Sequence, residues 1–184
     1  MLDNAQVARL LEETADLMEI AQEDGFRIRS YRNAASAIEN YPQPVMEMLR
    51  DPAQKVTDIK GIGKGIAHVL GEIAERGSFE RRDEILTRYP PTALELLKIQ
   101  GLGPKSIAMI WEHYRVSTID ELEALCKEGK LRELPRMGQK LEEKVLRSIE
   151  TYRKGAGRFL LSYGDEVAGE LRAWLSEVVA PERF

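Results

Sequence analysis

Three short turns hold the residues of this sequence that are best suited to binding chemistry. The first contains Gly61, Ile62, Gly63, Lys64 and Gly65, the second contains Gly101, Leu102, Gly103, Lys105 and Ser106, and a degenerate third contains Met137, Gly138 and Lys140 after Arg136 in place of the first glycine. Glycine permits positive φ, and a helix that begins directly after such a turn presents unpaired amide donors and partial positive charge. Phosphate is the natural ligand of that arrangement. The three copies therefore predict repeated contacts to a nucleic-acid backbone that read no bases.

The same turns also offer backbone carbonyl oxygens that would suit a monovalent cation. We expect K⁺ or Na⁺ to bridge between the turns and a phosphate, held by the carbonyls of Thr57, Ile59 and Ile62 in the first turn and of Leu97, Ile99 and Leu102 in the second. Two histidines and one cysteine argue against a structural zinc site.

Charge is distributed unevenly along the chain, whose formal net charge is −4. Residues 1–54 hold 5 basic and 10 acidic side chains, whereas residues 55–184 hold 22 basic and 21 acidic ones. The acidic excess lies before the glycine turns, so the balance permits nucleic-acid binding through amides without favouring it.

Hydrophobic spacing near 3.6 residues predicts the helices that position these turns. We expect an amphipathic helix over 3–22 that ends at Asp24-Gly25, an extended or turn-like entry over 26–29, and a helix that Ser30 caps. Ser78, Thr92 and Thr118 are expected to cap later helices; others are expected over 138–154 and from Val167 to Val178. No stretch alternates with a period of two, so the predicted fold is all-α, with two small helical subdomains that carry tandem helix-hairpin-helix motifs.

Other features narrow the class of protein. No apolar run reaches the length of a membrane span, and the start of the chain lacks the features of a signal peptide. The single cysteine, Cys126, cannot form an intrachain disulfide. These observations predict a cytoplasmic monomer that does not bind membranes.

The segment from Phe26 to Ala35, together with the first two glycine turns, resembles the family X DNA polymerases, especially the amino-terminal half of the bacterial PolX type and more distantly DNA polymerase beta. The resemblance implies a lyase-type helical domain over 1–88, a second DNA-binding subdomain over 89–155, and the lead-in to a palm over 156–184. The palm's Gly-Ser motif and Asp-x-Asp pair, which would hold divalent metal, do not occur in this sequence, and Asp165-Glu166 resembles a helix cap. We therefore expect no polymerisation from these residues.

The resemblance also implies a pocket for a 5′-phosphate, formed by Arg27, Tyr31 and Arg32. The family's Schiff-base lysine falls at Val69, which cannot form an imine, and a further pocket lysine falls at Gly65. Three functions remain open: binding of gapped or nicked DNA in base excision repair or related repair synthesis, abasic-site or 5′-deoxyribose phosphate lysis by a relocated lysine such as Lys60 or Lys64, and a helical scaffold for protein interaction.

Overall fold

The computed structural model describes residues 2–155, which are helical and contain no strand. The all-α prediction is confirmed for this part of the chain. The elements in order are α1 (Asn4–Ile20), α2 (Gly25–Glu39), α3 (Val45–Met48), η1 (Val56–Asp58), α4 (Lys64–Arg76), α5 (Glu80–Arg88), η2 (Pro91–Lys98), α6 (Pro104–Tyr114), α7 (Ile119–Lys127), η3 (Leu131–Glu133) and a helix over 139–155. The expected helix from Val167 to Val178 and the Asp165-Glu166 pair lie outside the described residues.

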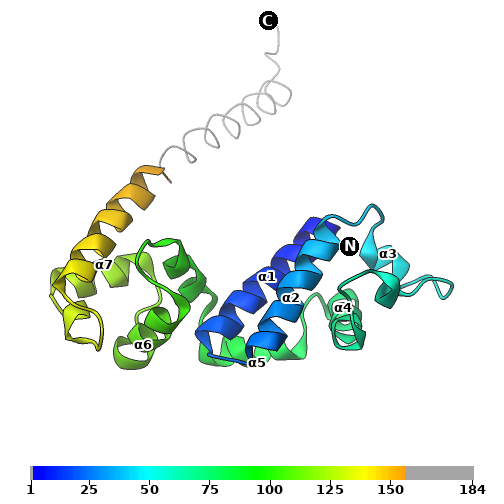
Figure 1. Ribbon diagram of the computed structural model, residues 1–184, viewed down its shortest axis with the longest axis horizontal. Helices are drawn as coiled ribbons and strands as arrows, with labels where there is room; N and C mark the ends of the chain where they lie inside the picture. The colour runs from blue at the N-terminus through cyan, green and yellow to red at the C-terminus, as the bar shows by residue number, and fades with distance from the viewer. Residues whose placement is uncertain (1, 156–184) are drawn as a thin grey trace, which may run out of the picture.

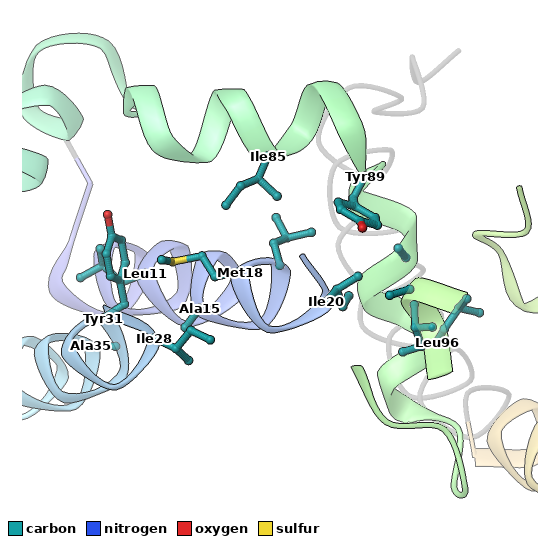
Figure 2. Close-up of a cluster of buried hydrophobic side chains, with 14 of the residues drawn as sticks. Leu11, Ala15, Met18, Ile20, Ile28, Tyr31, Ala35, Ile85, Tyr89 and Leu96 are labelled. Carbon is teal, nitrogen blue, oxygen red and sulfur yellow. The ribbon is translucent and has the colours of Figure 1, made fainter. Parts of the chain in front are cut away.

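The first two helices form the packing centre of the amino-terminal half, and α5 lies along α1 (Figure 2). Leu11 and Met18 of α1 are fully buried, and Ile28 and Tyr31 of α2 and Ile85 of α5 are nearly so. Burial of a side chain of this size contributes about 1.5–3 kcal/mol. These apolar contacts therefore hold α2 in one orientation, and α2 carries the predicted pocket residues.

Helices α3 and α4 lie at one end of the molecule, and α7 and the helix over 139–155 lie at the other (Figure 1). Helices α1 and α2 lie in the middle with α5 beneath them, and α6 lies between α5 and α7. Helix α1 links the two halves, because it contacts both η2 and α6. The first and second glycine turns are thus parts of one connected framework.

The beginning of α2 differs from the sequence-based expectation. The segment over 26–29, which we expected to be extended, is helical, and Ser30 lies inside the helix with its hydroxyl donating to the carbonyl of Phe26. Asp24 is the N-cap, because its Oδ1 accepts the amides of Phe26 at 3.0 Å and Arg27 at 3.1 Å. The Asp-Gly pair starts a helix rather than ending one, and Gln22 supplies the left-handed residue (φ 57°) between the two helices.

Two later caps also differ from expectation. Phe79 is the N-cap of α5, and the hydroxyl of Ser78 donates instead to the Asp83 carboxylate at 2.6 Å. The segment before the second turn is the 3₁₀ helix η2, and Thr92 lies within it, donating to the hydroxyl of Ser117. The predicted Thr118 cap of α7 is confirmed, including its capping box.

Candidate nucleic-acid interface

The three turns share one backbone conformation. The first residue of each is left-handed, with φ of 102° at Gly61, 103° at Gly101 and 64° at Arg136. The next residue donates its amide to the carbonyl three positions earlier, with N···O distances of 3.0 Å for Ile62 to Ile59, 3.2 Å for Leu102 to Ile99, and 3.0 Å for Met137 to Leu134. All three of these following side chains, Ile62, Leu102 and Met137, are buried. Arg136 therefore completes a third hairpin although a non-glycine residue is unfavourable at positive φ.

Close packing holds the first two turns against other helices. A Cβ on Gly61 would lie 3.6 Å from the Cβ of Ala37 in α2. A Cβ on Gly101 would lie 3.0 Å from Cδ1 of Leu141 in the helix over 139–155. Positive φ therefore favours glycine at both positions, and at Gly101 a Cβ would also crowd the Leu141 side chain.

The helices that follow the turns begin without a side-chain cap. Gly63 and Gly103 are the N-caps of α4 and α6, and neither helix start receives a side-chain hydrogen bond. By contrast, Asp3, Asp24 and Thr118 cap α1, α2 and α7. The first amides of α4 are therefore left for solvent or a ligand. At α6, Pro104 has no amide hydrogen and the Ser106 amide donates to the Gly103 carbonyl, so the Lys105 amide is the one left. The helix dipole favours an anion at both helix starts.

The remaining predicted residues of the turns surround these helix starts. Lys64, Lys105 and Lys140 are exposed, as are Gly65 and Gly138, and Ser106 is half-buried. Within the described chain, none of the three lysines forms an ion pair with a carboxylate, whereas Lys127 and Lys130 do. The first two turns thus combine an uncapped helix start with a lysine that has no ion pair among the described residues, and the third turn supplies such a lysine at Lys140.

A cleft of about 530 Å³ lies where α2 meets the first turn and the beginnings of α4 and α5. Arg27 and Tyr31 line it from α2, and Gly61, Gly63 and Gly65 line it from the turn. Burial raises the pKa of Tyr31, an effect that the nearby Arg27 charge opposes, so the phenol is neutral at neutral pH. The cleft therefore joins a guanidinium and a phenol hydroxyl to the glycine turn, and the carboxylates of Glu72 and Glu80 also line it.

Arg32, the third residue expected in the pocket, lies elsewhere. Its guanidinium contacts three carboxylates of α1, those of Glu12 at 3.6 Å, Asp16 at 2.9 Å and Glu19 at 2.6 Å. Hydrogen bonds to Asp16 and Glu19 raise the pKa of Arg32. Because Arg32 faces α1, the structure brings together only Arg27 and Tyr31 of the predicted trio.

The position implied for a Schiff-base lysine is an apolar wall of the same cleft. Val69 is 8% exposed and lines the cleft beside Ile66 and His68. None of the described residues that line it is a lysine, because Lys60 and Lys64 lie outside the lining. His68 was not among the predicted residues, although it is one helical turn from Lys64 and next to Val69, a spacing that places it at this cleft.

Phe26 and Arg81 also line the cleft and were not among the predicted residues. The Phe26 ring is 75% exposed, with the Arg29 guanidinium 4.4 Å from its centroid. Arg81 is held by the carboxylates of Glu23 and Glu84. Placing Phe26 at this edge requires knowing that α2 begins at Gly25, whereas the sequence predicted an extended segment over 26–29.

The carbonyls expected to hold a cation fit that chemistry in part. Ile59 and Ile99 each accept the amide of the buried residue in their own turn. Within the described chain, no backbone amide donates to the carbonyls of Thr57, Ile62, Leu97 or Leu102. Those oxygens keep their lone pairs for an ion or for water. No cluster of three or more His, Cys, Asp or Glu suited to a metal occurs among the described residues.

Comparison with known proteins agrees with this geometry. A family described as "Helix-hairpin-helix domain" matches residues 2–79, and one described as "SAM-like Helix-hairpin-helix tandem" matches residues 93–151. The chain is 30% identical over 171 residues to "DNA polymerase/3'-5' exonuclease PolX" of Bacillus subtilis, covering 93% of this chain and 29% of that protein. It is 28% identical over 123 residues to rat DNA polymerase lambda, covering 66% of this chain and 20% of that protein. The chain thus spans less than a third of either relative. In the described part, no helix is both long and apolar enough to cross a bilayer.

Proposed function

The chain is homologous to the amino-terminal, DNA-binding region of the family X DNA polymerases, and from that premise we propose that it holds gapped or nicked DNA by its sugar-phosphate backbone. The observation that carries the proposal is the recurrence of one turn conformation at Gly61, Gly101 and Arg136. Each turn precedes a helix start, and those of α4 and α6 carry no side-chain cap. Chemistry of this kind binds phosphates without distinguishing bases.

Binding at the hairpins would depend on backbone hydrogen-bond donors and on positive charge. A phosphate at the start of α4 would accept amides near Gly63 and Lys64, and one at the start of α6 would accept amides near Gly103 and Lys105. Hydrogen bonds to a charged group contribute about 1.5–3 kcal/mol each. Because the two turns belong to one connected framework, they would hold two separate stretches of backbone at a fixed spacing, which favours DNA that bends at a break.

We propose further that the cleft beside the first turn receives a terminal phosphate. Arg27 supplies charge, and Tyr31 supplies a neutral hydroxyl inside a cleft lined by three glycines. A terminal phosphate carries more negative charge than an internal one. It is also bonded to a single nucleotide, so no second nucleotide has to fit into the cleft. A break with a 5′-phosphate would then bind better than one with a 5′-hydroxyl.

A monovalent cation fits this proposal as an auxiliary ligand. The free carbonyls of Thr57 and Ile62, and of Leu97 and Leu102, would hold K⁺ or Na⁺ at the first and second turns. The ion would supply positive charge between carbonyl oxygens and phosphate. Replacing KCl by tetramethylammonium chloride at equal ionic strength should weaken DNA binding if such a site contributes.

Titration by fluorescence anisotropy tests the proposed function. Gapped, nicked and intact duplexes, each with a 5′-phosphate or 5′-hydroxyl at the break where there is one, are compared at two salt concentrations. We expect interrupted duplexes with a 5′-phosphate to bind best, and all affinities to fall steeply with salt. Equal affinity for all the duplexes would contradict the proposed preference for breaks. If the protein bound none of them, the proposed function itself would be wrong.

Borohydride trapping on abasic DNA is the matching test for lyase chemistry. Val69 has no amine, and the cleft holds no lysine among its described lining residues. We expect no covalent adduct. An adduct that disappeared in Lys60→Gln or Lys64→Gln would establish a relocated nucleophile instead.

A further inference from the structure

A second cleft, of about 340 Å³, lies between the second turn and the helix over 139–155. Lys98 lines it from the end of η2, and Lys144, Arg147 and Tyr152 line it from the helix. Its other lining residues are polar and uncharged, and no carboxylate is among them. This basic cleft is separate from the one that contains Arg27 and Tyr31.

The three cations of the basic cleft have no counter-ions within the described chain. Elsewhere the basic side chains are often neutralised, as for Arg82 by Glu13, Lys127 by Glu123, and Arg153 by Asp120. Lys98, Lys144 and Arg147 form no such ion pair with a described residue. Three like charges around one hollow repel one another, so their arrangement is unfavourable until an anion binds.

The basic cleft is built onto the second turn. The Gln100 amide donates to the Ser148 hydroxyl at 2.8 Å, which fastens the turn to the helix. The aliphatic part of Lys144 lies beside Gly101, where a Cβ would approach its Cδ at 3.5 Å. Lys98 directly precedes the turn, and its Nζ lies 6.0 Å from the centroid of the Tyr152 ring. The cleft and the open amide at the start of α6 are therefore neighbours along one short piece of chain.

We propose that the basic cleft is an additional binding site for the DNA backbone, which takes phosphates next to the one held by the second turn. The inference rests on the proposed function, because it extends the contact of a hairpin with DNA. Successive phosphates of one strand are spaced by about 3.4 Å along the duplex axis. A strand anchored at Gly103 would therefore bring several phosphates past a neighbouring group of cations. The paired Lys127 and Lys130 on and after α7 offer no comparable site.

Two double variants test this proposal. Lys144→Gln with Arg147→Gln removes two charges of the basic cleft from exposed positions of a helix, and glutamine is a good helix former. Lys127→Gln with Lys130→Gln removes the same charge from ion-paired surface positions. Anisotropy titrations with a gapped duplex over a salt series give the affinity and the slope of log K against log salt for each.

We expect the cleft variant to bind about tenfold or more weakly at low salt, with the magnitude of the salt slope reduced by about 2, which corresponds to two lost phosphate contacts. The control should stay within about twofold of the wild type, with its slope unchanged. If the wild type binds gapped DNA and the two variants behave alike, the proposal is overturned while the proposed function stands. If the wild type binds no DNA, the proposed function itself fails, and this extension fails with it.

Site-directed crosslinking distinguishes contact from long-range attraction. Cys126 is the one cysteine and is buried, so a photo-crosslinker can be attached selectively at Thr151→Cys in the basic cleft or at Ala124→Cys on α7. We expect a crosslink to the DNA strand from position 151 and none from position 124. Intact DNA binding without a crosslink at 151 would contradict the proposal.

Discussion

Replacing Gly63 with alanine tests phosphate binding by the first hairpin separately from the folding of that hairpin. Gly63 has φ −88° and ψ 177°, which any residue adopts, and a Cβ there would meet nothing within 4 Å. Alanine is a poorer N-cap than glycine by less than about 1 kcal/mol, so Gly63→Ala should fold with nearly unchanged stability. In the complex, its methyl would occupy the space of a phosphate seated on the start of α4.

The expected loss follows from the hydrogen bonds at stake. One amide bond to a charged phosphate contributes about 1.5–3 kcal/mol, and 1.4 kcal/mol corresponds to a factor of ten. Gly63→Ala should therefore weaken binding of gapped DNA by about 10- to 100-fold. Gly61→Ala is the matched comparison, because Gly61 has φ 102° and alanine there should lower the free energy of unfolding by at least about 1–2 kcal/mol.

Urea unfolding and anisotropy on the same samples give both quantities. The reasoning predicts a binding defect with little loss of stability for Gly63→Ala, and a combined defect for Gly61→Ala. A correctly folded Gly63→Ala protein whose affinity stays within twofold of the wild type would show that no phosphate approaches the start of α4.

Three further changes are predicted. Arg27→Gln should weaken binding to DNA with a 5′-phosphate severalfold, whereas Arg32→Gln should leave this binding unchanged. Arg32→Gln should lower the free energy of unfolding by less than about 1 kcal/mol, because the ion pairs of Arg32 are half-exposed. Anisotropy measures the binding and urea titration the stability, and equal binding defects in the two variants would contradict the placement of Arg32 against α1. Burial raises the pKa of Cys126 to about 12, so its thiol should resist iodoacetamide at pH 8 in the native protein and react only after denaturation, and rapid native labelling would refute this. Glu142 is buried and accepts the backbone amide and guanidinium of Arg132, so Glu142→Gln should lower the free energy of unfolding by about 1.5 kcal/mol in urea titration; no measurable change would mean that the pair adds nothing.

The repeated glycine turns made much of the fold predictable, because glycine, a buried aliphatic residue and a helix start are all local signals. The third turn shows the limit of that logic. Arg136 reads as a broken copy, yet it takes the same left-handed conformation as Gly61 and Gly101. Met137, the residue that follows, is buried like Ile62 and Leu102, and burial of such a side chain favours the turn. That burial comes from tertiary structure and is not visible at position 136 itself.

The candidate pocket was predicted less well, and the reason lies in the beginning of α2. Asp24-Gly25 has the composition of a helix end, but the Asp24 carboxylate caps the next helix. Once 26–32 is helical, Arg27 and Tyr31 are four residues apart and share a face, while Arg32 turns toward α1. The three acidic partners of Arg32 are distant in sequence, so only tertiary structure could show that this arginine is already occupied.

The carboxylates of α1 have a consequence for how a charged ligand would arrive. They bind arginines from two other helices, Arg32 of α2 and Arg82 of α5, yet Glu12 remains half-exposed and the first 54 residues keep twice as many acidic as basic side chains. A duplex that drifts toward this side is repelled, whereas the lysines after the turns attract it. At physiological salt both forces act only within about 8 Å, so they turn the molecule in its last moments before contact rather than drawing it from afar. The acidic helix would thus orient the protein electrostatically, which raises the share of encounters in which the hairpins meet the DNA first.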